Sequence, residues 1–141
     1  MATIVRNQAR KKSAVGRLRF PVFRTAFALL LLLEGLSSAL RFATRFSYVM
    51  IYPALTVSLI AMRLVVAVQQ FGAGWMVIGG RPPGPPFARV ALAQSAVLVT
   101  FELGFGLAPT NLFPAYRWWA VGVYWIYALI GILVFRPERR L

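Results

Sequence analysis

Few ionisable side chains interrupt the long apolar stretches of this chain, and these few are the best placed to do chemistry. Two carboxylates, Glu34 and Glu102, and two arginines, Arg41 and Arg63, lie within such stretches or at their ends. A charge inside a bilayer is costly, so it usually faces a partner or marks a functional site. Carboxylates at this depth could carry protons or bind a substrate, and an acid–base pair could equally join two helices.

Helical rise predicts how deep each of these side chains lies. Counted from the start of its apolar stretch, Glu34 would lie ~14 Å into the membrane and Glu102 ~18 Å. Arg63 would lie ~25 Å along its helix, close to the cytoplasmic edge. Arg41 falls at the outer end of the first stretch. Matching these depths predicts two pairs, Glu34 with Arg63 and Glu102 with Arg41.

The polar side chains around these charges are too few to line an evident path for protons or substrate. They are Ser37, Ser38, Thr56, Ser58, Gln94, Ser95 and Thr100. We therefore expect the four charged residues to bridge helices or to bind a neighbouring subunit.

Composition removes most catalytic and cofactor chemistry. The chain has no cysteine and no histidine. Disulfides, thiolate metal sites and the usual histidine ligands of zinc and haem are therefore excluded. There is no glycine-rich phosphate loop ending in Lys-Ser or Lys-Thr, and a serine nucleophile would lack a histidine base. We expect a non-catalytic protein without a cofactor or a metal.

Four apolar stretches must position the charged residues, and 60% of the 141 residues are hydrophobic. The stretches are Thr25–Ala43, Phe46–Ala67, Val90–Leu107 and Trp118–Phe135. Each is close to the ~20 residues that cross a ~30 Å hydrocarbon core. Only helices satisfy their backbone within such a segment. The sequence predicts an all-α membrane protein with one four-helix domain, residues 25–141, after a basic segment, residues 1–24.

Prolines, glycines and aromatic residues predict local features. Pro21 favours a turn just before the first helix, and Pro53 predicts a kink inside the second. Trp75–Ile78 is too short to cross and suits an interfacial segment, followed by a stiff linker at Gly79–Pro86. The aromatic residues of the fourth stretch are expected at the headgroup level. They are Trp118, Trp119, Tyr124, Trp125 and Tyr127.

Small residues also recur at helical spacing. Gly35 and Ala39 are four residues apart, as are Ala91 and Ser95. Such pairs allow two membrane helices to approach closely.

Cation placement predicts the orientation, because cytoplasmic flanks carry excess Lys and Arg. Twelve cations flank one side of the four stretches, and three flank the other: Arg41, Arg45 and Arg117. Both termini are therefore expected in the cytoplasm, with four spans. A bacterial inner membrane fits this pattern. An organellar membrane stays open, because mitochondrial presequences are also rich in Arg and poor in acid.

The first 24 residues form a cationic segment without an acidic residue. Its cations are Arg6, Arg10, Lys11, Lys12, Arg17, Arg19 and Arg24. Because they adjoin a membrane helix, we expect them to contact anionic lipid or a partner protein rather than nucleic acid.

Two functions from different classes remain. The preferred one is a non-catalytic accessory subunit of a larger membrane complex of respiratory or photosynthetic type. It would pack through its helices and dock its basic N-terminus. The alternative is a small transporter or channel that uses Glu34 and Glu102.

Overall fold

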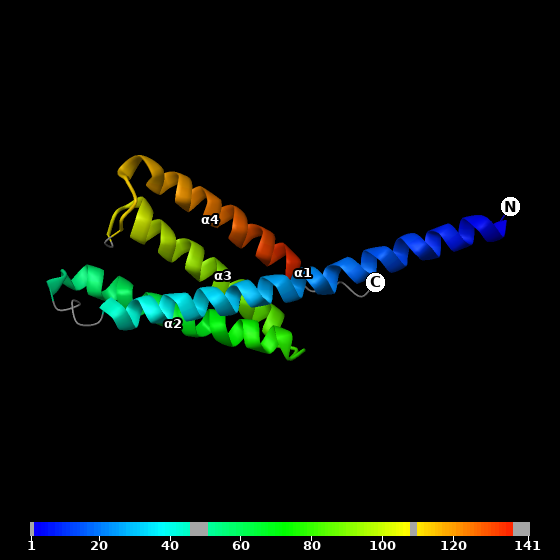
Figure 1. Cartoon of the computed structure of the whole chain (residues 1–141), viewed down its shortest axis with the longest axis horizontal. Helices are drawn as coiled ribbons and strands as arrows, with labels where there is room; N and C mark the ends of the chain where they lie inside the picture. The colour runs from blue at the N-terminus through cyan, green and yellow to red at the C-terminus, as the bar shows by residue number, and fades with distance from the viewer. Residues whose placement is uncertain (1, 46–50, 108–109, 137–141) are drawn as a thin grey trace.

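The computed structural model describes residues 2–45, 51–107 and 110–136, with the side chains of residues 21–44, 51–107 and 110–136. All regular secondary structure in these ranges is helical (Figure 1). The helices are α1 (Ala2–Arg45), α2 (Ala54–Ile78), α3 (Gly84–Val99) and α4 (Pro114–Val134), and α3 continues into a π-helical turn, η2 (Thr100–Gly104). The predicted all-α class is confirmed.

Four helical segments are long and apolar enough to cross a membrane, which gives the chain the architecture of a multi-pass membrane protein. They are Pro21–Thr44, Ala54–Ile78, Gly84–Gly104 and Pro114–Val134. Between 17% and 39% of the most apolar window of each segment is buried inside the protein. Most of the apolar surface therefore faces outward, where it is available to contact lipid or another protein.

Helix α2 differs most from its prediction. Pro53 lies just before the helix with ψ 149°, and α2 begins at Ala54. Proline suits this place because the first helical N–H groups have no partner inside the helix. The expected kink at Pro53 is therefore wrong. Trp75–Ile78 is not a separate segment after the second helix, because α2 runs through it to Ile78. Residues 46–50 of the predicted stretch lie outside the described residues.

Two other prolines also sit differently from expectation. Pro21 lies inside the continuous helix α1, where the Thr25 hydroxyl donates a 2.9 Å hydrogen bond to the Pro21 carbonyl. Helix α3 begins at Gly84, within the expected linker, because Pro85 occupies the first helical turn and needs no N–H partner there. The turn before it uses Gly80 at φ 64°.

Close backbone contact joins α1 to α2, the most extensive helix pair of the bundle. A Cβ atom on Gly35 would lie 2.6 Å from the Ala67 carbonyl oxygen. One on Gly74 would lie 2.6 Å from the Ala28 carbonyl oxygen. Both glycines are therefore required by the approach of one backbone to the other.

One end of the bundle has a close-packed apolar core, which we call the apolar half. Its buried residues are Leu31, Ala73, Ala88, Leu92, Ala96, Ala128 and Phe135. Arg24 joins α1 to the end of α4 there, donating 3.1 Å hydrogen bonds to the carbonyls of Val134 and Arg136. A cation at a helix C-terminus satisfies free carbonyls and complements the helix dipole.

Candidate functional site

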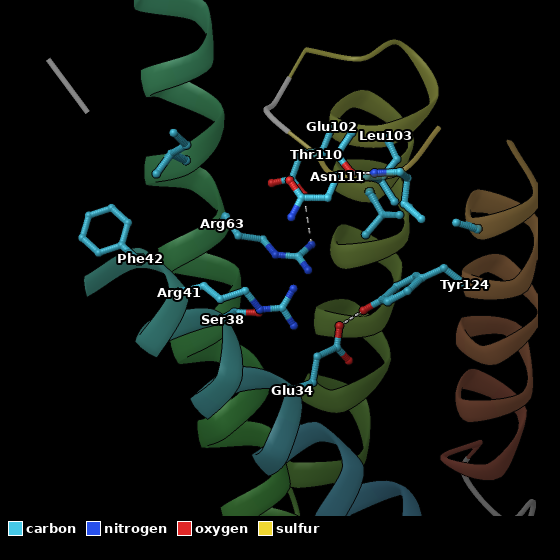
Figure 2. A pocket seen from close by; sticks show the side chains of 14 residues that line it. Glu34, Ser38, Arg41, Phe42, Arg63, Glu102, Leu103, Thr110, Asn111 and Tyr124 are labelled. Carbon is cyan, nitrogen blue, oxygen red and sulfur yellow. Dashed lines mark hydrogen bonds and ion pairs between the residues drawn. The ribbon is translucent and has the colours of Figure 1, made fainter. Parts of the chain in front are cut away.

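A cavity of about 610 Å³ lies toward the other end of the bundle. All four membrane segments line it, and the side chains of Glu34, Arg41, Arg63 and Glu102 reach into it (Figure 2). We call this cavity the polar pocket. Thr110 and Asn111, from the connection before α4, also line it.

An ion pair crosses the upper part of the polar pocket as drawn in Figure 2. Arg63 Nη1 of α2 lies 3.4 Å from Glu102 Oε2 of η2, and the two side chains are 21% and 14% exposed. Glu102 stands on the π-helical turn, whose hydrogen bonds include one from Phe105 N to the Thr100 carbonyl at 3.2 Å. A π-helical turn changes the direction of the side chains that it carries. We attribute the orientation of Glu102 toward α2 to this turn.

A hydrogen-bonded group closes the bottom of the polar pocket, with one residue from each helix. The Tyr124 hydroxyl of α4 donates to Glu34 Oε1 of α1 (Figure 2), and Ser95 Oγ of α3 donates to the same oxygen at 3.4 Å. Ser95 Oγ lies 2.6 Å from Tyr124 Oη. Gln70 Nε2 of α2 donates to Tyr124 Oη at 3.5 Å. We call Glu34, Gln70, Ser95 and Tyr124 the hydroxyl network.

The charge pairs that depth predicted are not the pairs that form. Arg63 binds Glu102, whereas Arg41 donates from Nε and Nη2 to Ser37 Oγ at 3.3 and 3.0 Å. Arg63 attracts Glu34 electrostatically, but no ion pair between them is formed. Because α2 begins later than predicted, Arg63 lies ~14 Å along its helix rather than ~25 Å. This later start moves Arg63 toward the end of the bundle that holds Glu102, where the two side chains meet.

The basic N-terminal segment lies apart from the polar pocket. The backbone of residues 2–20 continues α1 as a helix that extends away from the bundle (Figure 1). The side chains of six of its cations are outside the described residues: Arg6, Arg10, Lys11, Lys12, Arg17 and Arg19. Arg24 is described, and it binds the end of α4.

Sequence reasoning missed Tyr124 and Gln70. Tyr124 was expected at the headgroup level, but it faces the interior beside Tyr127, with ring centroids 5.5 Å apart. Its helical spacing from the buried residues Val121 and Ala128 was the available signal. Gln70 is 1% exposed and follows Arg63 by seven residues, which places both on one face of α2.

Comparison with protein-family models, with curated proteins and with solved structures found no match for this chain. What the polar pocket does must therefore follow from its own residues. Within the described ranges, no three acidic, cysteine or histidine side chains gather as a metal site would require. Two carboxylates and two guanidinium groups around one cavity are suited to bind a charged or strongly polar small molecule.

Proposed function

We propose that this chain is a non-catalytic membrane protein that binds a small polar molecule in the polar pocket and acts as a small carrier. The observation that supports it is the convergence of Glu34, Glu102, Arg41 and Arg63 on one cavity of about 610 Å³. Ligand pockets span roughly 300–1,000 Å³ and hold a few convergent polar groups. Ionisable residues at membrane depth that face such a cavity are more typical of a binding site than of simple helix contacts.

The packing supports a carrier with access from one end rather than an open channel. The hydroxyl network lies at the bottom of the polar pocket, and the apolar half follows it, with Leu31 and Leu92 at 0% exposure. By the cation count, both termini are cytoplasmic, so the polar pocket opens toward the opposite side of a bacterial inner membrane.

Cysteine labelling tests this orientation, and the chain contains no cysteine of its own. Ala2→Cys and Leu141→Cys should be protected from an impermeant reagent added to intact cells, whereas Asn111→Cys should react. Labelling of Ala2→Cys from outside would refute the orientation.

A ligand screen tests the carrier proposal itself. The full chain, purified in nanodiscs, is heated with a panel of charged and neutral polar metabolites, and the midpoint of unfolding is recorded. At least one compound should raise the midpoint by binding the folded protein. Glu34→Gln and Arg41→Gln should weaken that rise, whereas Arg81→Gln, at an exposed turn residue outside the polar pocket, should keep it. If no compound binds, or if both pocket variants respond like the unaltered chain, the carrier proposal fails.

The accessory-subunit function is the second candidate, and Gln94 supports it. Its side chain is exposed about halfway along the membrane segment Gly84–Gly104, and no hydrogen bond to it is found among the described residues. In lipid, a neighbouring protein must supply the partner of such an amide. The helical extension of α1 and its cations add a docking element for an acidic protein surface or anionic lipid.

Extraction in mild detergent separates the two candidates. A subunit should co-migrate with a larger complex, and Gln94→Leu or deletion of residues 2–19 should weaken that association. Val97→Leu, on the same exposed face of α3, is the matched control. Migration of the unaltered chain as a small homo-oligomer would contradict the accessory role.

A further inference from the structure

The charges around the polar pocket point to the class of its ligand. We propose that the pocket binds a compact zwitterion, with its anionic group between Arg41 and Arg63 and its cationic group at Glu34 and Ser38. This inference rests on the proposed binding function of the same pocket.

The anionic end is supported by the two guanidinium groups. Arg41 from α1 and Arg63 from α2 extend into the same space (Figure 2). Arg63 Nη1 is buried and makes no hydrogen bond, although it pairs electrostatically with Glu102 at 3.4 Å. A guanidinium carries five N–H donors in a planar fork that fits a carboxylate or phosphate group. Arg41 uses Nε and Nη2 on Ser37 and retains further donors.

The cationic end is supported by Glu34 and Ser38, which lie one helical turn apart on α1. Both line the polar pocket. The Ser38 side chain is 4% exposed and its hydroxyl has no hydrogen-bond partner, an arrangement that a buried polar group rarely keeps. A primary ammonium donates three hydrogen bonds, and the Glu34 carboxylate and the Ser38 hydroxyl can accept two of them. A bound ammonium would therefore satisfy the hydroxyl of Ser38.

Charge balance favours a zwitterion over a simple ion. A monoanion would gain Arg41 and Arg63 but would meet the carboxylates of Glu34 and Glu102. A monocation would gain Glu34 and Glu102 but would be repelled by the guanidinium groups of Arg41 and Arg63. These interactions are stronger at membrane depth than in water because the surroundings screen charge poorly. A ligand with both charges places each one beside its opposite.

The spacing on α1 sets an upper limit on ligand length. Glu34 and Arg41 are seven residues apart, a rise of ~10 Å along the helix axis. Because both side chains reach into the same cavity, we expect a ligand that contacts both to be no longer than about this rise. Two sources offer such chemistry: a free amino acid with its ammonium and carboxylate, or the ammonium and phosphate of a phosphatidylethanolamine headgroup.

Calorimetry on the full chain in phosphatidylglycerol nanodiscs tests the ligand class. The probes are glycine, β-alanine, 4-aminobutyrate and 6-aminohexanoate, with propionate and ethylammonium as the single-charge controls. At least one amino acid should bind about tenfold or more tightly than both controls, as expected for one additional charged hydrogen bond. Arg41→Gln should remove this preference and Arg41→Lys should largely restore it, while Arg81→Gln should leave it unchanged.

Discs of phosphatidylethanolamine distinguish the two sources. If the headgroup is the ligand, the amino acids should bind more weakly there, and native mass spectrometry should find this lipid retained by the unaltered chain but not by Arg41→Gln. Unchanged amino-acid binding identifies a free ligand. If a neutral compound or a single-charge control binds as tightly as any amino acid, and this lipid is not retained, the zwitterion inference is wrong while the binding function stands. If nothing binds in either disc or in the wider metabolite screen, the binding function itself is wrong.

Discussion

The two ends of the bundle are built from the same four helices but pack in opposite ways. In the apolar half, Leu31, Leu92 and Phe135 are fully buried, and small residues bring the backbones together. Toward the other end, α3 and α4 diverge from α1 and α2 (Figure 1), and the polar pocket lies there. The comparison indicates that tight packing at one end allows the helices to diverge at the other end. There the charged side chains face one another across a cavity and do not fill it.

The largest expected effect concerns the tight end. Gly74→Val would drive its Cβ to 2.6 Å from the Ala28 carbonyl oxygen, so α1 and α2 must separate. Overpacking of this kind costs about 3 kcal/mol. Denaturation in mixed detergent micelles, followed by circular dichroism, measures the loss. Gly122→Val is the matched control, because a Cβ on Gly122 meets no atom within 4 Å. Equal stability of the two variants would contradict the close contact.

The hydroxyl network should respond more mildly. Glu34→Leu removes the acceptor for Tyr124 and Ser95, and hydrogen bonds between membrane helices contribute only ~0.6–2 kcal/mol. Glu34→Gln keeps the size and an accepting oxygen, so its stability should stay near that of the unaltered chain. The same denaturation assay applies. Should Glu34→Gln unfold as easily as Glu34→Leu, the negative charge and not the hydrogen bonding would be what stabilises the helices.

The smallest effect is expected where Arg24 meets the end of α4. Arg24→Gln loses the charge that complements the helix C-terminus, a contribution of ~0.3–1 kcal/mol. Thermal unfolding at low and high salt measures this loss of stability. High salt should reduce the difference in unfolding midpoint between Arg24→Gln and the unaltered chain. Arg81→Gln serves as the control, because the Arg81 side chain is exposed in the turn between α2 and α3. A loss that salt does not change would point to packing instead of charge.

The number of membrane spans was predictable from the sequence, but the residues at which the helices begin and end were not. Apolar composition identified four membrane helices because each needs ~20 apolar residues. The region from Phe46 to Ile78 is apolar for longer than one span, so hydropathy could not fix where α2 begins. Near the C-terminal end of this region, Gly74 allows α1 to approach α2 closely.

The candidate site was predictable in its residues but not in its connections. Glu34, Arg41, Arg63 and Glu102 stood out because charge is rare in apolar stretches, and the structure brings all four to one cavity. Their pairing depended on the register of α2 and on the π-helical turn that carries Glu102, and neither has a clear sequence signal. Composition could not distinguish Tyr124 from the other aromatic residues of the fourth stretch. What composition does not show is its position on α4, which turns its side chain toward the interior of the bundle.

The pocket end should be an accessible binding cavity, while the other end of the bundle should be closed. Single cysteines at Ala120 and Ala96 test this difference directly, because Ala120 lines the polar pocket and is only partly buried, whereas Ala96 belongs to the apolar half. A small impermeant methanethiosulfonate reagent needs the thiolate and therefore water at the site. Added to intact cells, it should label Ala120→Cys many times faster than Ala96→Cys, and a bound zwitterion should slow that labelling. If Ala120→Cys is as unreactive as Ala96→Cys in the folded protein, the polar pocket is not open to a ligand and the proposed binding function is wrong.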